Sequence, residues 1–435
     1  MRQAFLGYDA SDNSTAMIAQ ARARLRSAAA GDHPVYQDNQ IIPASSNVAK
    51  RVPPMNAKLI TIIGAGIGGL TAALALQRRG FKVQVFERSK ELREIGAGIT
   101  VSPNARRALR DLEIDRALEA SSSSAQEMYI CDYATGQVRH RNYDSSIVEK
   151  YGFHVLQVHR ADLHDLLRQA VNANDENALH ADHEFVGLEQ DEHGVSAAFA
   201  NGASARGDVL IGADGYASAV RSCLFPSEPP KFTGQVSFRA LIPRESVPTS
   251  IIERGLAYYP SPKRTLMHYP MRGGKIFNLL GNAQSANWEE EGWSIRATVE
   301  EFAQAYEDHT PEVLALIRAV PAGGLFKWGL RDREPLQTWT VGRVTVLGDA
   351  AHPMTPFLGQ GACLAVEDGL VLGRAFAAAE TVEDALHRYE AARKTRGTNV
   401  QMWSREQGQA LQEGHKGRTA IDRGLYDYDP VTVPV

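Results

Sequence analysis

The sequence has few cysteines and no excess of basic charge, and each shortage excludes a class of protein. Three cysteines, Cys131, Cys223 and Cys363, lie 92 and 140 positions apart among 435 residues. Neither a disulfide framework nor a CxxC zinc site is therefore available, and we expect no metal site. This cysteine usage favours a reducing, cytoplasmic location. The net charge of −4 disfavours nucleic acid as the main partner, because phosphate binding needs a basic surface.

One uncharged run is long enough to raise the question of a membrane span. It covers Leu59 to Gln77, 19 residues, which is about the length that crosses a bilayer. Four glycines, Gly64, Gly66, Gly68 and Gly69, fall within six positions. At about 0.8–1 kcal/mol each, they would destabilise a continuous helix by roughly 3–4 kcal/mol. Although membrane helices tolerate glycine better than soluble ones, we expect no membrane span.

The length predicts two or three structural units, at roughly 150 residues each. Residues 1–57 hold no Glu and show no apolar periodicity, so we predict a flexible N-terminal extension. A transit peptide, or translation that begins at Met55, remain alternatives. Alternating apolar segments separated by Pro and Gly turns over 231–330 predict antiparallel strands. The stretch 381–435 predicts one or two amphipathic helices and a tail.

A strand, a glycine turn, a helix and a second strand follow one another from Lys58, which predicts a βαβ unit. The fingerprint Gly64-x-Gly66-x-x-Gly69 lies at the start of the helix, and Glu87 ends the second strand. A dinucleotide needs this arrangement: the glycines permit a tight turn and close backbone approach, and the helix N-terminus supplies N–H groups. The acid would accept hydrogen bonds from ribose hydroxyls. The fingerprint does not distinguish FAD from NAD, and a glycine-rich turn without a ligand is the alternative.

Two further apolar strands run into Asp-Gly and Gly-Asp turns, in VLIGADGYASAVR (209–221) and VTVLGDAAHPMTPFLGQG (344–361). Together with the glycine fingerprint, these two turns make three motifs. In their order and spacing, the sequence resembles the class A flavoprotein monooxygenases, which include salicylate, 3-hydroxybenzoate and 6-hydroxynicotinate hydroxylases. The resemblance covers about residues 58–428, including the closing LYDYDP.

The resemblance implies an α/β fold in which a Rossmann-like FAD-binding domain of the GR2 type is interrupted by a mainly antiparallel substrate sheet and closed by C-terminal helices. The implied boundaries are a FAD-binding part at 58–230, which also carries some substrate-domain strands, a substrate sheet at 231–330, a second FAD-binding part at 331–380, and helices and a tail at 381–435.

The resemblance also implies cofactor-binding residues. Beside Gly64, Gly66, Gly68 and Gly69 they are Glu87, Arg88, Thr100, Arg160, Asp214 and Asp349, with Gly361 and Ala362 in the loop and helix start at 359–362. Each has a simpler alternative. Asp214 and Asp349 are also typical turn residues, Arg160 could be a surface arginine, and Thr100 an inert strand residue. We predict a structural hydrogen-bonding role for His352 and a packing role for Cys363.

The match is weaker at the substrate pocket. Tyr269 is our candidate catalytic residue, by a hydrogen bond to a substrate hydroxyl, with a packed strand aromatic as the alternative. Thr265 stands where hydroxylases of small aromatic acids often have a histidine, and Phe357 replaces another histidine of the 6-hydroxynicotinate type. His268 cannot replace them, because successive strand residues point to opposite faces. These departures predict a more apolar pocket, with Arg239, Tyr269 and Phe357 as substrate-binding residues.

The function that the resemblance implies is a FAD-dependent monooxygenase that hydroxylates a phenolic or N-heteroaromatic substrate through a flavin C4a-hydroperoxide. Its partners would be the small aromatic substrate, O2 and NADH or NADPH, which visits transiently because there is one dinucleotide fingerprint. We expect a monomer or homodimer. The alternatives are an epoxidase or hydroxylase of a larger polycyclic or terpenoid substrate, a FAD-dependent reductase that never activates oxygen, and a flavin-binding module without activity.

Overall fold

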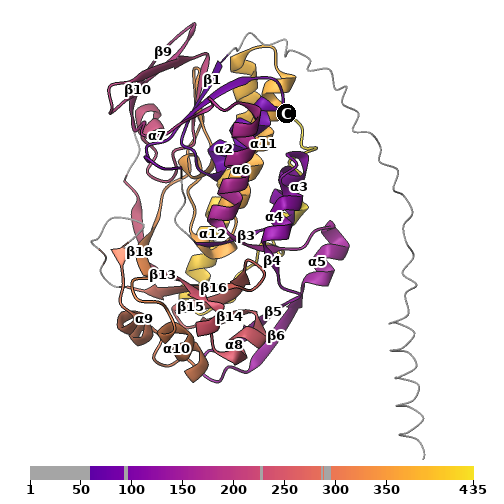
Figure 1. Ribbon diagram of the computed structural model, residues 1–435, viewed down its shortest axis with the longest axis vertical. Helices are drawn as coiled ribbons and strands as arrows, with labels where there is room; N and C mark the ends of the chain where they lie inside the picture. Colours follow the sequence, from indigo (N-terminus) through magenta and orange to yellow (C-terminus); the bar gives the residue numbers. More distant parts are fainter. Residues whose placement is uncertain (1–58, 93–96, 226–228, 286–287, 289–294) are drawn as a thin grey trace, which may run out of the picture. The chain divides into compact units, whose positions relative to one another are not determined.

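The computed structural model describes residues 59–92, 97–225, 229–285, 288 and 295–435 (Figure 1). The chain divides into two units, Met1–Lys50 and Arg51–Val435, and the description below concerns the second. The predicted extension 1–57 lies outside the described residues. The boundaries predicted at 231, 331 and 381 stay predictions.

A six-stranded, mostly parallel sheet forms the first layer. The order is β19-β20-β12-β1-β2-β8, and only the β19–β20 pair is antiparallel. Strands β1, β12 and β20 are apolar and almost wholly buried, as expected for parallel strands covered on both faces. The bounds are β1 (Leu59–Ile63), β2 (Lys82–Phe86), β8 (Leu179–His180), β12 (Val209–Gly212), β19 (Thr340–Val341) and β20 (Val344–Val346).

Helices pack closely around this sheet. The βαβ unit predicted from Lys58 is confirmed, because α2 (Ile67–Gln77) connects the parallel strands β1 and β2. α11 (Gly361–Ala378) packs on α2 at very short range: a Cβ added to Gly369 would lie 2.7 Å from the Ala72 nitrogen. The other helices of this layer are α3 (Pro103–Asp111), α4 (Asp115–Ser121), α6 (Arg160–Asn174), α7 (Ala219–Leu224) and α12 (Val382–Gln412).

An eight-stranded sheet forms the second layer, in the order β17-β18-β13-β16-β15-β14-β5-β6. All its pairs are antiparallel except β14 with β5, so the prediction of antiparallel strands over 231–330 is confirmed. The two strands at one end come from a much earlier part of the chain. The bounds are β5 (Glu127–Cys131), β6 (Val138–Tyr143), β13 (Lys231–Pro243), β14 (Leu256–Ser261), β15 (Arg264–Met271), β16 (Ile276–Gln284), β17 (Ile295–Arg296) and β18 (Leu325–Asp332).

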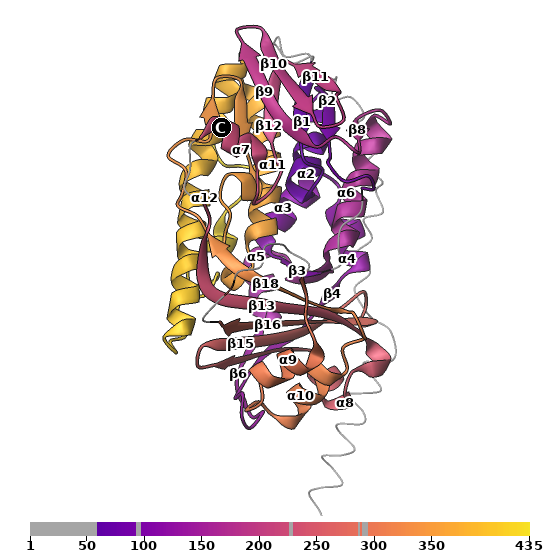
Figure 2. The same ribbon diagram turned by 90° about the vertical axis from the view of Figure 1, so that its left-hand side faces the viewer.

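The eight-stranded sheet separates short helices from long ones, as Figure 2 shows. On one face lie α8 (Thr249–Arg254), α9 (Val299–Ala305) and α10 (Pro311–Arg318), which the sequence did not predict. They cover a compact apolar cluster that includes Leu266, Phe277 and Phe302. The other face points toward α6, α11 and α12, and its side chains are available to a site between the two layers.

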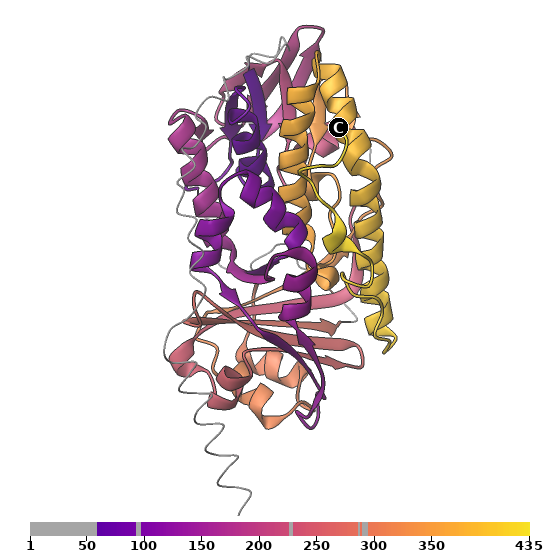
Figure 3. The ribbon, with the colours of Figure 1, turned by 90° about the vertical axis from the view of Figure 1, so that its right-hand side faces the viewer.

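The remaining elements are small. One three-stranded sheet consists of β9 (Phe185–Asp191), β10 (Gly194–Phe199) and β11 (Ser204–Gly207), and another of β3 (Gly98–Val101), β4 (Ser123–Ser124) and β7 (Leu156–His159). The others are the helix α5 (Asp144–Tyr151) and the 3-10 turns η1 (Arg244–Ser246), η2 (Gly348–Ala350), η3 (Pro356–Leu358) and η4 (Leu425–Asp427). The stretch predicted as one or two C-terminal helices is the single helix α12, which runs beside α11 and reaches the level of the second sheet (Figure 3). Among the described residues, no helix has the length and apolarity needed to cross a membrane.

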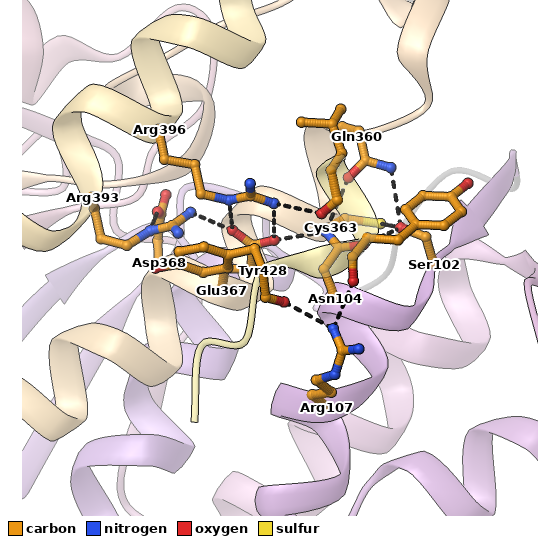
Figure 4. A network of polar contacts seen from close by, with 12 residues as sticks. Ser102, Asn104, Arg107, Gln360, Cys363, Glu367, Asp368, Arg393, Arg396 and Tyr428 are labelled. Carbon is orange, nitrogen blue, oxygen red and sulfur yellow. Dashed lines mark hydrogen bonds and ion pairs between the residues drawn. The ribbon is translucent and has the colours of Figure 1, made fainter. Parts of the chain in front are cut away.

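Two consecutive buried carboxylates on α11, Glu367 and Asp368, join the helices to the loops around the sheet ends (Figure 4). Glu367 accepts hydrogen bonds from Asn104 Nδ2 at 2.6 Å and from Arg396 Nε at 2.7 Å, and lies 2.7 Å from Arg393 Nη2. Asp368 accepts hydrogen bonds from Arg393 Nε and His352 Nε2 at 2.7 Å and from the Gly348 N–H at 2.9 Å. The predicted structural role of His352 is thereby confirmed.

The same network extends to the C-terminal segment. Arg396 donates to the Leu425 carbonyl at 3.1 Å, and its guanidinium lies 4.0 Å from the centre of the Tyr428 ring. Arg107 of α3 donates to the carbonyls of Tyr426 and Tyr428 at 2.7 and 2.9 Å. The LYDYDP segment therefore closes over the ion pairs from the side opposite the sheet loops.

The charges in this network depend on one another. Burial alone would raise the pKa of both carboxyl groups. Arg396 and Arg393 hold the pKa of Glu367 below its ordinary value, and His352 and Arg393 hold the pKa of Asp368 below its ordinary value. Folding therefore gains stability from their ionised forms above the ordinary carboxyl pKa of about 4 and loses it as the pH falls toward the lowered values.

We expect Glu367→Gln to lower the free energy of unfolding at pH 7 by about 3–5 kcal/mol, because both arginines lose a buried counter-charge. Urea unfolding measures this. The variant should also lose less stability than the wild type between pH 5 and pH 3, because one of the two titrating carboxylates is gone. The matched control is Glu113→Gln, whose pair with Arg78 lies at the surface and is worth at most about 1 kcal/mol. A Glu367→Gln protein that unfolds within 1 kcal/mol of the control would contradict the role of the network.

Candidate active site

A cavity of about 1780 Å3 opens between the two layers. Its lining comes from the glycine turn at the start of α2, from β3, from the loop before α11 and from one face of the eight-stranded sheet. Cavities that hold one drug-sized ligand measure about 300–1000 Å3. The cavity therefore has room for a large cofactor and a second molecule.

The glycine turn presents a backbone surface to this cavity. Gly64 has φ +104°, and a Cβ there would lie 2.4 Å from the Ala213 oxygen, while a Cβ at Gly69 would lie 2.0 Å from the Gly64 oxygen. These two glycines are required by close packing within the βαβ unit. Gly66 differs, because it lines the cavity and a Cβ there would meet no protein atom within 4 Å. Gly68 also lines the cavity, with Leu347 and Ala365 behind it.

Glu87 lies at the end of β2 and braces the glycine turn. Its carboxylate accepts hydrogen bonds from the Ala65 N–H at 2.9 Å and the Ser89 N–H at 3.0 Å. His164 of α6 supports the same turn through a 2.8 Å hydrogen bond to the Ala65 carbonyl, a contact that no local sequence pattern indicates. Arg88 is exposed and lines the cavity.

The loop before α11 brings an acid and a helix N-terminus to the cavity. Asp349 is exposed to the cavity, and the protein that surrounds it raises the pKa of its carboxyl group. Gly361 and Ala362, the first residues of α11, also line the cavity, and a Cβ on Gly361 would lie 3.9 Å from Asp349 Oδ1. Thr100 lines the cavity next to this loop, and its carbonyl accepts a hydrogen bond from the buried Cys363 thiol of α11 at 3.4 Å. Cys363 has the predicted packing role.

The structure separates the two aspartates that the sequence places in similar turns. Asp349 faces the cavity, whereas the Asp214 carboxylate accepts hydrogen bonds from the Ser218 hydroxyl at 2.5 Å and the Val220 N–H at 3.1 Å, at the start of α7. Its neighbours Ala213 and Gly215 line the cavity, but Asp214 does not. Arg160 lines the cavity at the start of α6, and its positive charge partly offsets the rise in the pKa of Asp349 that burial causes.

On the sheet side, two polar side chains converge on Gly98 of β3. A Cβ on Gly98 would lie 2.5 Å from Tyr269 Oη, and Arg239 Nη1 donates to the Gly98 carbonyl at 3.4 Å. Tyr269 lines the cavity, and its hydroxyl makes no hydrogen bond with the described residues. Burial raises the pKa of Tyr269 to about 12, although Arg239 opposes this effect. The tyrosine is therefore a neutral hydroxyl, available to a ligand, beside a positive charge.

The remaining predicted pocket residues also lie around the cavity. Thr265 and Tyr269 share the cavity face of β15, whereas His268 points to the opposite face, where its Nδ1 hydrogen-bonds to the Gly255 carbonyl at 2.9 Å. The expectation that His268 cannot substitute for Thr265 is confirmed. Phe357 lines the cavity and packs over Gly408 of α12, where a Cβ would lie 2.6 Å from its ring.

Two groups near the site were missed by the sequence analysis. Asn278 accepts a hydrogen bond from the Gly98 N–H at 3.0 Å and so fixes β3 against the second sheet. Gln360, which precedes α11 and lines the cavity, hydrogen-bonds to Ser102 and Asn104 at 3.0 Å. Their partners lie between 180 and 258 positions away, so no local pattern could have indicated them.

These features define a dinucleotide-binding oxidoreductase in which one face of the eight-stranded sheet offers a separate binding surface for a second ligand. The free space at Gly66, the N–H groups at the start of α2 and the open carboxylate at the start of α11 suit a diphosphate and a polyol chain. The FAD binding domain family matches residues 57–404. The chain belongs to this family and, with the relatives described next, to the FAD-dependent aromatic monooxygenases.

Two relatives show the level of similarity. The chain is 34% identical over 352 residues to a 3-hydroxybenzoate 6-hydroxylase of Polaromonas naphthalenivorans (strain CJ2), covering 80% of this chain and 87% of the relative. It is 34% identical to a 6-hydroxynicotinate 3-monooxygenase of Pseudomonas fluorescens, covering 80% and 90%. Among solved structures, Klebsiella pneumoniae HpxO complexed with FAD and uric acid matches with a TM-score of 0.75 at 26% identity, covering 87% of this chain and 97% of that one.

The glycine turn offers a matched pair of variants. Gly69→Ala should lower the free energy of unfolding by about 1–3 kcal/mol or more, because its methyl group collides with backbone. Gly66→Ala should leave the stability of the apoprotein within about 0.5 kcal/mol and weaken FAD binding at least tenfold, because its methyl group fills the space next to the turn. Thermal unfolding and titration of apoprotein with FAD measure the two effects. Wild-type FAD affinity in Gly66→Ala would contradict this assignment.

Proposed function

We propose that this enzyme uses NADH or NADPH to hydroxylate a phenolic or N-heteroaromatic substrate with O2 in the cavity between its two layers. The observation that carries the proposal is the continuity of that cavity, which joins the glycine turn and Asp349 to the open hydroxyl of Tyr269. FAD, when bound, supplies the redox and oxygen chemistry, as cofactors generally do.

In this proposal the protein residues bind, orient and exclude water. The start of α2 with Gly66 and Gly68 holds the diphosphate, and Arg88 and Glu87 flank the adenosine end. Asp349 accepts hydrogen bonds from the ribitol hydroxyls. Gly361 and Ala362 offer the α11 N-terminus, whose dipole stabilises negative charge that develops on the nearby ring. The rest of the cofactor-binding surface consists of Thr100, Arg160 and the backbone of the Asp214 turn.

Tyr269 and Arg239 act on the substrate in this proposal. The Tyr269 hydroxyl donates a hydrogen bond to the oxygen or nitrogen of the substrate ring, and Arg239 stabilises the negative charge that forms there as the ring becomes electron-rich. Burial lowers the pKa of Arg239, but an arginine guanidinium keeps its charge in proteins. Phe357 closes the apolar end of the pocket.

We also propose a cytoplasmic location, because Cys131, Cys223 and Cys363 are all free thiols.

The reaction can be tested directly with FAD-loaded enzyme. A panel of phenols and hydroxypyridines, including 3-hydroxybenzoate and 6-hydroxynicotinate, is screened for stimulated oxidation of NADH and NADPH, and products are analysed by mass spectrometry under 18O2. We expect one 18O atom in the product for each nicotinamide oxidised in the coupled reaction. Stimulated oxidation with no oxygenated product from any compound would support a reductase and contradict the proposal.

Tyr269→Phe should lower kcat/KM about 10- to 100-fold, because one hydrogen bond to the reacting group is lost. Since the pKa of Tyr269 is raised to about 12, the hydroxyl stays protonated up to about pH 11, and the kcat/KM profile between pH 6 and pH 10 should keep its shape in the variant. The matched control is Tyr259→Phe, on the opposite sheet face, which should alter stability but not kcat/KM. Equal kcat/KM in Tyr269→Phe and wild type would rule out the assigned role.

A further inference from the structure

The cavity floor has a polar group that the proposed reaction does not use. Asn282 of β16 is 6% exposed, lines the cavity and donates through Nδ2 to Thr265 Oγ1 at 3.2 Å. Its carbonyl oxygen, Oδ1, is buried and has no hydrogen-bond partner among the described residues. A buried amide oxygen without a partner costs about 1–3 kcal/mol, so a ligand that satisfies it gains affinity.

Neighbouring side chains orient this amide. Thr265 lies directly opposite Asn282 in the β15–β16 pair, and the Tyr258 hydroxyl of β14 hydrogen-bonds with the Thr265 side chain. Three strands therefore contribute one connected row, Tyr258, Thr265 and Asn282, in which only the Asn282 oxygen is left open. The row contains no ionisable group that is charged near neutral pH.

Apolar side chains form part of the wall around the row. Phe357 and Leu411 lie beside Thr265 and Asn282 in a small cleft, whose other lining residues are Gln235, Lys263 and Arg264. The Arg264 guanidinium donates to the Ala305 carbonyl and to Asp308. Met267 and Leu280 form the floor between this row and the Tyr269 end, because they share the same faces of β15 and β16. These apolar neighbours strengthen a hydrogen bond to the open oxygen.

The row lies apart from the Tyr269 and Arg239 end. Thr265 and Tyr269 are four residues apart on one strand, which at about 3.3 Å per residue separates their Cα atoms by roughly 13 Å. Arg239 is directed to Gly98 and to the Trp328 ring, 5.1 Å away. A ligand that uses both ends places its hydroxyl at Tyr269 and a different polar group at Asn282.

We propose that Asn282, Thr265 and Tyr258 form a second substrate subsite, which takes a neutral N–H or O–H donor carried by the aromatic substrate on the side away from the hydroxyl that Tyr269 binds. This proposal rests on the proposed function for the identity of the ligand as substrate. A carboxylate at this position is disfavoured, because it would face the unpaired carbonyl oxygen of Asn282. The substrate is therefore an aminophenol-like or lactam-bearing aromatic compound with its donor at this end.

The test measures binding to FAD-loaded enzyme, by calorimetry or by quenching of flavin fluorescence. The probes are 6-hydroxy-2(1H)-quinolinone, which has a hydroxyl at one side and a lactam N–H at the other, and its N-methyl derivative. We expect the N–H probe to bind wild type at least tenfold tighter than the N-methyl probe, and Asn282→Leu to reduce this ratio to below about twofold. Thr265→Val, which removes only the hydroxyl that orients the amide, should reduce the ratio in the same direction.

Tyr259→Phe is the matched control. Tyr259 is fully buried on the opposite face of β14, where its hydroxyl accepts a hydrogen bond from Arg254, and it does not line the cavity, so the ratio should stay at the wild-type value. Flavin content and thermal unfolding confirm that each variant is folded. Equal binding of the two probes to wild type, no measurable binding of the N–H probe, or an unchanged ratio in both Asn282→Leu and Thr265→Val would overturn the subsite.

The two proposals fail in different ways. An N–H preference that depends on Asn282, together with no oxygenated product from any compound, would contradict the monooxygenase and leave the subsite standing. Efficient hydroxylation of 3-hydroxybenzoate with no N–H preference would contradict the subsite and leave the reaction standing.

Discussion

The pairing of Glu367 and Asp368 with Arg393 and Arg396 is the interaction on which the rest of the cofactor-facing surface depends. Consecutive helix residues point about 100° apart, so one carboxylate reaches Asn104 and the other reaches Gly348 and His352. The two arginines are three residues apart on α12, on one helix face, and can serve both carboxylates. Four charges thus hold together segments from across the chain, and none of them lies in the cavity.

This arrangement adds polar contacts to loops that also pack through apolar residues such as Leu347, Ala350 and Leu358. The Gly348 N–H is tied to Asp368, and Gln360 is tied to α3 through Asn104. Both loops carry residues that line the cavity. Buried ion pairs add little net stability, because desolvation offsets much of the attraction. Their hydrogen bonds do, however, fix the orientation of the side chains and loops that they join. The network therefore orients both loops through contacts made by charges that lie outside the cavity.

Much of the architecture could be predicted because it follows from the local periodicity of apolar residues along the sequence. The βαβ unit, α11 and the antiparallel strands each show their pattern within about 20 residues. The short helices α8 to α10 were missed, because six to eight residues give too little periodicity. The membership of β5 and β6 in the second sheet depends on pairing with β14, which lies more than a hundred residues away. The site shows the same limit: Asp214 and Asp349 follow similar strands, but only Asp214 has a serine four residues later whose hydroxyl donates a hydrogen bond to its carboxylate.

The parallel pairing of β5 with β14 has a consequence for the order in which the protein is made. Residues 127–143 leave the ribosome well before residues 256–261, so β5 has no β14 to pair with until more than a hundred further residues have been synthesised. Its unpaired edge is open to other chains during that interval, as unpaired strand edges generally are. On the other side of the hairpin, Arg139 and Arg141 of β6 pair with Asp132 and Glu127, along the edge that β6 keeps in the finished sheet. Charge therefore guards the permanent edge of the hairpin, whereas the waiting edge of β5 is covered only when β14 arrives.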